Sequence, residues 1–209
     1  MAERIGCLII GYICGCFMTA ELVCRKLTGK PAGEVGKTGN PGMANVMASL
    51  GFKPGILVLA GDIGKTIAGV VLAWLLFGSR LGHICVLWAA LGVTLGHDLP
   101  FWLKMHGGKG VATTCAGIVL FSPFFGFLSM IAGMLVVFAT QSLALGGVVI
   151  PAAFAICMAL REGSEAGWLS AALLVLMIWR HFPALKKIGT PQMDRTDVLG
   201  AIRKNLRKS

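Results

Sequence analysis

The segment HGGKGVAT at residues 106–113 combines glycines and a lysine in a pattern that suits anion binding. Gly107, Gly108 and Lys109 come directly before an apolar run that begins at Val111 and is expected to be helical. The first N–H groups of a helix have no partner within it and the helix dipole is positive there, so anions bind at this end. We therefore expect a phosphate site at this turn. The alternative is an ordinary turn whose lysine faces the cytoplasm.

A second polar segment, residues 30–45, carries a glycine at every third position from Gly33 to Gly42. Such a loop can bring backbone N–H groups close to an anion. Its hydrogen-bonding side chains include Lys37, Thr38, Asn40 and Asn45. The Gly-Lys-Thr within it is similar to the end of a P-loop, but the first glycine of that motif would fall at Pro31 and no strand precedes it. We expect this segment to bind phosphate. The alternative is a flexible connecting loop.

Ionisable residues inside apolar segments are costly to bury and usually have a function. Asp62 and Lys65 lie three residues apart, hence on one helix face, where an ion pair lowers the cost of burial. Lys65 could also reach a substrate phosphate, and the alternative is a purely structural pair. His97 and Asp98 lie near the end of another apolar run, and His181 at the end of the last one. A lone histidine such as His181 is often only structural.

Several common catalytic patterns are absent from the sequence. It contains no serine nucleophile elbow, no HEXXH and no GxGxxG, and its acids form no obvious carboxylate pair. The seven cysteines are odd in number and form no CxxC, so we expect buried small hydrophobes rather than disulfides or a metal site. We expect no metal and no cofactor. Phosphate recognition beside a bilayer remains.

The elements that position these residues are expected to be membrane-spanning helices. The 209-residue chain is 56% hydrophobic and only 13% charged, against about 25% in soluble domains. This composition excludes a disordered chain and disfavours a soluble enzyme. The net charge of +10 is explained more simply by basic cytoplasmic loops than by a nucleic-acid partner.

Seven apolar runs are candidates for membrane spans, each of which needs about 20 residues. They are Ile5–Cys24, Gly55–Phe77, Ile84–Leu103, Val111–Phe121, Phe124–Thr140, Ser142–Leu160 and Trp168–Trp179. The fourth and seventh runs are short and could be tilted or re-entrant. We expect an all-α, polytopic membrane protein with five to seven crossings, seven being preferred, that forms one domain over residues 1–209.

The distribution of basic residues predicts the orientation of the chain in the membrane. If the N-terminus lies outside and seven helices cross, 15 of the 19 Lys and Arg residues fall in the inside segments. Residues 186–209 then form a basic cytoplasmic tail, in which Val198, Ile202 and Leu206 follow a four-residue spacing typical of an interfacial helix. We expect the first run to be kept rather than cleaved as a signal peptide.

The polar segments resemble, in order and over nearly the whole chain, the motifs of the bacterial acyl-phosphate:glycerol-3-phosphate acyltransferases, the PlsY-type membrane enzymes. Residues 39–45, GNPGMAN, resemble part of the first region. Residues 55–65, GILVLAGDIGK, are similar to GILVLLLDxxKG, and residues 96–113, GHDLPFWLKMHGGKGVAT, resemble GHxFPxFLxFKGGKGVAT. The last match is long and specific.

The resemblance implies a seven-helix enzyme of the bacterial plasma membrane whose motifs lie at the cytoplasmic face. It implies transfer of a fatty acyl group from acyl-phosphate to the sn-1 hydroxyl of glycerol 3-phosphate, giving lysophosphatidic acid and phosphate. No metal, cofactor or acyl carrier protein is needed at this step. The implied partners are the two substrates and membrane lipids, and the oligomeric state is left open.

The resemblance also implies roles for individual residues. The residues expected to hold the two phosphates are Asn40, Asn45, Gly107, Gly108 and Lys109, with Lys37, Thr38 and Gly39 at the positions of the family's GSGN. Lys65 and Asp62 would support them, together with His97. Ser142 matches a serine in a turn between two later helices, and His181 matches the histidine of the final motif. Lys109, Asn40 and His181 are expected to act in catalysis.

The chain departs from the family pattern most clearly in its final motif. The family's H-R-E-N is His181-Phe-Pro-Ala184 here, and its G-S-x-P is Gly15-Cys-Phe-Met18. Two alternatives therefore stay open. One is a catalytically weak or inactive paralogue that binds phosphorylated metabolites or lipids. The other is a small anion transporter, a class in which paired intramembrane charges and helices broken at glycine are common.

Overall fold

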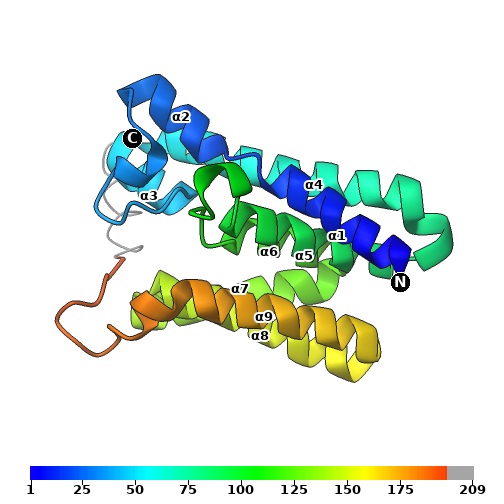
Figure 1. Cartoon of the computed structure of the whole chain (residues 1–209). Helices are drawn as coiled ribbons and strands as arrows, with labels where there is room; N and C mark the ends of the chain where they lie inside the picture. Colours follow the sequence, from blue (N-terminus) through cyan, green and yellow to red (C-terminus); the bar gives the residue numbers. More distant parts are fainter. Residues whose placement is uncertain (197–209) are drawn as a thin grey trace. The chain divides into compact units, whose positions relative to one another are not determined.

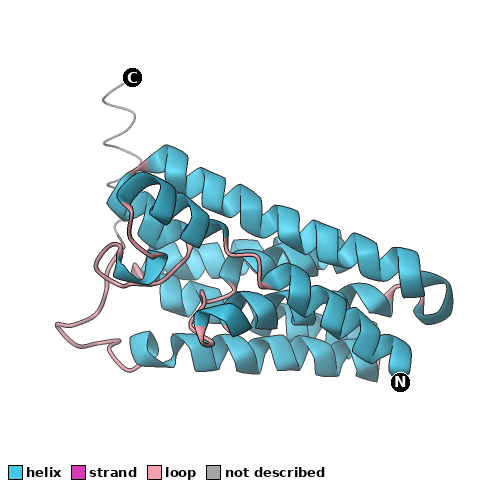
Figure 2. Ribbon diagram, turned by 45° about the horizontal axis from the view of Figure 1, so that its top comes forward, coloured by secondary structure: helices cyan, strands magenta, loops and turns pink. Residues whose placement is uncertain are grey.

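Every regular element in residues 1–196, the part of the chain that the computed structural model describes, is a helix (Figure 2). The elements are α1 (Ala2–Gly15), α2 (Thr19–Thr28), the 3-10 turn η1 (Ala32–Glu34), α3 (Met43–Leu50), α4 (Phe52–Leu81), α5 (Ile84–Asp98), η2 (Phe101–Leu103), α6 (Val111–Phe121), α7 (Pro123–Thr140), α8 (Leu143–Arg161) and α9 (Ser164–Leu185). The chain divides into two compact units, Met1–Pro123 and Phe124–Ser209, and each is described by itself.

Six helical stretches of the described residues are long and apolar enough to cross a membrane. They are Ala2–Thr28, Phe52–Leu81, Ile84–Leu103, Pro123–Thr140, Leu143–Arg161 and Ser164–Leu185. The remaining apolar run is helix α6, whose 11 residues extend only about 16 Å at 1.5 Å per residue, roughly half of a bilayer core. The predicted fold class, an all-α polytopic membrane protein, is confirmed. Six spans lie within the predicted range, whereas the preferred number of seven stays a prediction.

Helices α1 and α5 of the first unit lie side by side in the same direction (Figure 1). At Gly11 and Gly15, and at Gly92 and Gly96 on the other helix, an added Cβ would collide with the backbone of the facing helix. Small residues thus allow the two backbones to approach closely, as they do between helices in lipid. This tight pair fixes the position of the end of α5, which carries site residues.

The first predicted run, Ile5–Cys24, lies within one candidate span, Ala2–Thr28, but the helix of this span is interrupted between α1 and α2. The interruption exposes backbone carbonyls that require partners in an apolar setting. The Trp102 indole Nε1–H donates to the Cys16 carbonyl at 2.8 Å, and Lys65 Nζ donates to the Phe17 carbonyl at 3.0 Å. Two side chains that lie far away in the sequence therefore stabilise the break.

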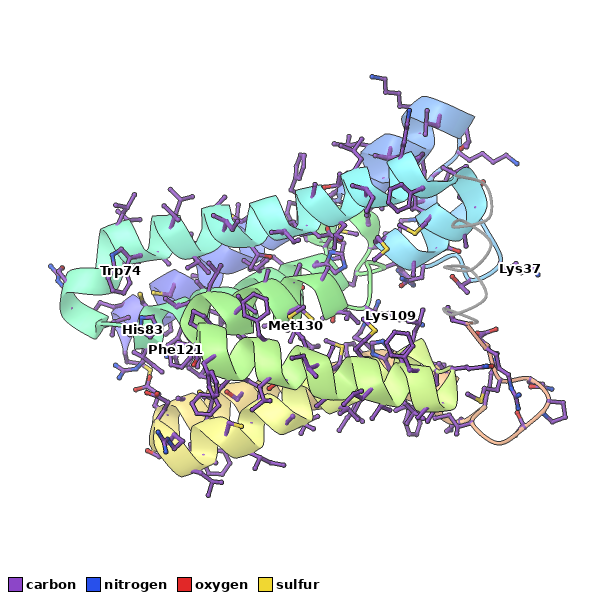
Figure 3. All side chains as sticks on the ribbon, turned by 180° about the vertical axis from the view of Figure 1, so that it is seen from behind. Lys37, Trp74, His83, Lys109, Phe121 and Met130 are labelled. Atoms are coloured by element: carbon purple, nitrogen blue, oxygen red, sulfur yellow. The ribbon has the colours of Figure 1, made fainter. Side chains whose placement is uncertain are left out.

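At the end of the first unit where α4 turns into α5, aromatic side chains connect this turn to α6. The His83 ring stacks on Phe121 with centroids 4.7 Å apart, and Trp74 meets His83 edge-on (Figure 3). His83 Nε2 also lies 2.5 Å from the Phe121 carbonyl. These contacts connect the turn between α4 and α5 to the end of α6.

The second unit contains α7, α8 and α9. Helices α8 and α9 pack together, and a short turn at Gln141 connects α7 to α8, as predicted. The Thr196 N–H donates to the Gln141 carbonyl at 2.9 Å, so the segment after α9 returns to this turn. The predicted basic tail, residues 186–209, is described only as far as Thr196, and Val198, Ile202 and Leu206 lie outside the described residues. A single domain over residues 1–209 stays a prediction.

Candidate functional site

The predicted phosphate loop, residues 30–45, is folded against its neighbours. An apolar cluster from α2, the loop, α3 and α4 underlies it: Ala20, Val23, Cys24, Ala32, Val35, Val46 and Val58. The buried Glu21 carboxylate accepts the Ala32 N–H at 2.7 Å and is paired with Arg25 at 2.6 Å. The sequence analysis did not predict this role of Glu21. An acidic residue within an apolar run usually has a function, and that feature could have indicated it. The structure therefore disagrees with the flexible-connector alternative.

Asn45 organises the inside of this loop. Its Nδ2 donates to the Val35 carbonyl at 2.7 Å, and its Oδ1 accepts the Thr38 hydroxyl at 2.9 Å. The side chain is buried, and both ends of its amide are engaged within the loop. Asn45 therefore sets the shape of the loop that carries Thr38, and its contact with a phosphate stays a prediction.

The outer part of the loop is the part that can meet a ligand. Lys37 is exposed and Asn40 is partly exposed. Gly36 and Gly39 have φ values of +76° and +59°, a region that glycine adopts readily and L side chains rarely do. Figure 3 shows Lys37 at the same end of the first unit as Lys109, with Trp74, His83 and Phe121 toward the other end.

Asp62, Lys65 and His97 form a buried polar cluster between α4 and α5. Lys65 Nζ lies 2.9 Å from Asp62 Oδ1, so the predicted ion pair is confirmed. It also lies 2.7 Å from His97 Nδ1, and His97 Nδ1 is 3.5 Å from Asp62 Oδ1. Exposures of 2%, 6% and 4% keep all three away from water. The sequence placed His97 near the end of its run, but it could not show that His97 joins this pair.

The turn that carries Lys109 is bonded to the end of α5. The Gly107 N–H donates to the Asp98 carbonyl at 3.1 Å, and the Gly108 N–H donates to the His97 carbonyl at 3.0 Å. A Cβ at Gly107 would collide with the His97 carbonyl, and one at Gly108 with the His97 imidazole. These two N–H groups thus bond the turn to the end of α5, and phosphate binding at Gly107 and Gly108 stays a prediction. Lys109 and the start of α6 remain the candidate anion-binding groups.

The start of α6 is fixed by a short chain of hydroxyl groups. Thr113 Oγ1 donates to the Gly110 carbonyl at 3.0 Å, and Thr94 Oγ1 donates to Thr113 Oγ1 at 3.2 Å. Gly110 has a φ of +68°, and a Cβ there would meet the buried Asp98 carboxylate. Lys109 therefore extends from a backbone that is held on both sides.

Ser142 and His181 belong to the second unit. Ser142 Oγ accepts the Leu145 N–H at 3.3 Å and so caps α8, and His181 Nδ1 lies 3.0 Å from the Met177 carbonyl. Both side chains are buried. Their expected roles at the substrate stay predictions. Within the first unit, the cluster of Asp62, Lys65 and His97 lies beside the Gly107–Lys109 turn.

The fold and this site define an integral membrane protein, all helical in its described part, with a folded glycine loop and a lysine-bearing turn. The family model for glycerol-3-phosphate acyltransferase matches residues 5–190. Glycerol-3-phosphate acyltransferase 1 of Lactobacillus johnsonii is 35% identical over 200 residues, 95% of each chain, and that of Lactobacillus acidophilus is 30% identical over 203 residues, 97% of each. The chain belongs to the glycerol-3-phosphate acyltransferase family.

Solved structures show the same fold. The crystal structure of PlsY (YgiH), an integral membrane glycerol 3-phosphate acyltransferase, has a TM-score of 0.82 to this chain in its glycerol 3-phosphate form, at 24% identity, covering 95% of this chain and 98% of PlsY. The lysophosphatidic acid form gives 0.81 at 22% identity, covering 96% and 98%. The resemblance predicted from the motifs is confirmed, as is the expected class of enzyme, an acyltransferase.

Proposed function

We propose that this protein transfers a fatty acyl group from an acyl-phosphate to the sn-1 hydroxyl of glycerol 3-phosphate and releases lysophosphatidic acid and phosphate. The observation that carries the proposal is the family match over residues 5–190. The two lactobacillal relatives are glycerol-3-phosphate acyltransferases, and PlsY has been crystallised in a glycerol 3-phosphate form and in a lysophosphatidic acid form. These names support the acceptor and the product. The acyl-phosphate donor rests on the motif resemblance.

The proposed reaction needs no covalent enzyme intermediate, because an acyl-phosphate is already activated. The acceptor oxygen attacks the acyl carbon, the bond from that carbon to the phosphate oxygen breaks, and phosphate leaves. A phosphate oxygen of the substrate takes the hydroxyl proton. The protein then has to neutralise the phosphate charge, aim the hydroxyl and stabilise the oxyanion.

We assign these tasks to the side chains and backbone groups at one end of the first unit. This end carries residues 30–45 and the Gly107–Lys109 turn, and we call it the loop end. Lys109 neutralises the phosphate on which the negative charge develops, and Asn40 directs a substrate oxygen. Lys37, Thr38 and Gly39 extend the phosphate site from the folded loop. On the motif resemblance alone, Ser142 and His181 are also proposed to act on the substrates.

The charge distribution of the first unit supports a site at the cytoplasmic face. The cations of its loop end are Arg25, Lys26, Lys30, Lys37, Lys53, Lys104 and Lys109. The other end has Arg4 and Arg80, and Arg80 is 3.6 Å from Glu3. Cytoplasmic loops are enriched in Lys and Arg, so we place the loop end in the cytoplasm, the N-terminus outside and the protein in a bacterial plasma membrane.

The direct test is an assay of the purified protein in nanodiscs with palmitoyl-phosphate and glycerol 3-phosphate. Phosphate and lysophosphatidic acid should appear together. Lys109→Ala should lower kcat/KM by about a hundredfold or more, because it removes a charged group from the phosphate site. Lys104→Ala, which changes an exposed lysine five residues away, is the matched control and should leave the rate unchanged.

Three results would contradict the proposal or its assigned residue. Phosphate without the lipid would indicate plain hydrolysis or another acceptor. Neither product from well-folded protein would favour the binding role that the altered final motif suggested. Equal rates for the wild type and Lys109→Ala would remove Lys109 from the proposed site.

A further inference from the structure

The segment that leads into α6 carries a histidine where the family pattern carries a lysine. The family's FKGGKG is MHGGKG at residues 105–110, so His106 takes the place of the first lysine. Histidine is the only side chain that ordinarily changes its charge between pH 5 and 8, whereas lysine stays charged over this range. Beside the permanent cation Lys109, the chain thus places a group of a type whose charge depends on pH.

The backbone that carries His106 is tightly folded. Lys104 and Met105, the two preceding residues, have φ values of +53° and +63°, a region that residues other than glycine seldom adopt. The His106 N–H donates to the Leu103 carbonyl at 3.0 Å and closes this turn. The position of His106 is therefore set by the backbone before it.

A hydrogen bond to the same turn fixes the proton of the His106 ring. Nδ1 of His106 lies 2.6 Å from the Lys104 carbonyl oxygen. A carbonyl oxygen can only accept, so Nδ1 has to donate and carries a proton. Nε2 then has a lone pair in the neutral ring and an N–H donor in the protonated ring. The side chain is exposed, so a ligand that arrives from the solvent can reach Nε2.

His106 and Lys109 are held close together. Only Gly107 and Gly108 separate them, so no side chain stands between them in the sequence. Three residue steps limit the distance between their Cα atoms to about 11 Å. The N–H groups of both glycines are bonded to the end of α5, which fixes this spacing. A phosphate has several acceptor oxygens and can bind an imidazole and an ammonium group at the same time.

We propose that protonated His106 is a second phosphate-binding group beside Lys109, which donates its Nε2–H to an anionic oxygen of a substrate. Phosphate binding then weakens as the pH rises and the ring loses its charge, so this site is sensitive to pH. The proposal rests on the proposed function and extends it. The oxygen belongs to glycerol 3-phosphate or to the acyl-phosphate, and kinetics separate the two.

Other titratable and charged groups lie around this segment, and the test has to separate them from His106. They are Lys104 and Lys109 on the segment itself, His97 and Asp98 at the end of α5, and Tyr12 and Cys16 in and next to α1. A substitution of His106 leaves all of them in the chain. Comparing the wild type with His106→Lys at each pH therefore cancels their titration, as well as that of the substrate phosphate.

Kinetics in nanodiscs test the contact with the substrate. KM is measured for the wild type and His106→Lys toward the two ends of the range in which histidine changes its charge, at about pH 5.5 and about pH 8. The ratio of the wild-type KM to that of the variant should rise about threefold to tenfold, because a charge-assisted hydrogen bond is lost. A rise for glycerol 3-phosphate assigns the oxygen to the acceptor, and one for palmitoyl-phosphate assigns it to the donor. A ratio that is constant for both substrates would overturn the proposal.

Lys53→His makes the reverse exchange and is the matched control. Lys53 is exposed on α4, outside the segment of His106. The ratio of the KM of this variant to that of the wild type should stay constant over the same pH range. A change as large as that between the wild type and His106→Lys would attribute the effect to the general charge of the loop end, and would overturn the contact by His106.

Nitrogen NMR of histidine-labelled protein in nanodiscs tests the same contact without turnover. The chain has four histidines, so the spectrum of His106→Ala identifies the signals of His106 by difference. The neutral ring should carry its proton on Nδ1. Inorganic phosphate at constant ionic strength should move the titration of Nε2 to higher pH, because a ligand that prefers the protonated ring favours that form. A neutral ring protonated at Nε2, or a titration that ignores phosphate, would overturn the proposal, whereas a shift in a protein without acyltransferase activity would leave the contact standing.

Lys109→Ala tests whether the two groups share one phosphate. Without the Lys109 ammonium group, phosphate should bind more weakly, and the shift of the His106 titration at the same phosphate concentration should become smaller. Lys53→Ala, at the exposed position on α4, is the control and should keep the full shift. A full shift in Lys109→Ala would show that His106 binds phosphate on its own, and would overturn the shared site.

Discussion

The buried charges of the first unit depend on one another. Taking Asp62 and Lys65 out of water is costly, and the cost is offset only when good geometry satisfies both groups. Sequence spacing could predict this pair, because residues three apart share a helix face. It could not predict the Phe17 carbonyl or His97 as further partners, since they come from the break after α1 and from α5, and their positions depend on tertiary packing.

Removing one member of this pair should therefore cost more than removing both. We expect Asp62→Asn or Lys65→Met alone to lower the free energy of unfolding by about 3–5 kcal/mol, because each leaves an uncompensated buried charge. The double variant should recover much of that loss. The measurement is the loss of folded protein in detergent as a function of temperature. A double variant less stable than either single one would show that the two charges are satisfied independently.

Among the helices, α1 and α2 show what hydropathy does not predict. The run Ile5–Cys24 is apolar throughout most of its length, so it predicted one span, yet the chain leaves the helix between Gly15 and Thr19. The break is stable because Trp102 and Lys65 donate to its carbonyls. Those partners lie 86 and 48 residues away in the sequence. A local pattern contains no information about such bonds. The bounds of α6, α7 and α8 were predicted to within one residue, whereas the run Trp168–Trp179, predicted to be short, is part of the longer helix α9, Ser164–Leu185.

The break provides a prediction at the scale of the helix. Trp102→Phe keeps an aromatic ring but leaves the Cys16 carbonyl without its indole donor. An unsatisfied buried acceptor costs about 1–3 kcal/mol, so the melting temperature in detergent should fall. Trp168→Phe, at a position that is 76% exposed, is the control and should leave it unchanged. Equal melting temperatures for the two variants would show that the bond from Trp102 does not stabilise the break.

For the molecule as a whole, composition and charge were enough to predict the fold class. They indicate a chain in lipid, where only a helix satisfies every backbone group locally. The motifs determined the family, since the 96–113 segment is long and specific. The details of the site required the structure. Gly107, Gly108 and Asn45 matched phosphate-binding positions, but their bonds within the turn and the loop become visible only when the neighbouring chain segments are placed.

The orientation in the membrane gives the last prediction, which concerns the whole first unit. Lys37 is exposed at its cation-rich loop end, and Arg80 is exposed at the other end, beside Glu3. In intact spheroplasts, a charged maleimide that cannot cross the membrane should label Arg80→Cys but should reach Lys37→Cys only after permeabilisation, because cytoplasmic loops are enriched in Lys and Arg. The parent chain is the control, since none of its seven cysteines is exposed and six of them lie in helices. Labelling of Lys37→Cys from outside would reverse the orientation and place the proposed phosphate site away from the cytoplasm.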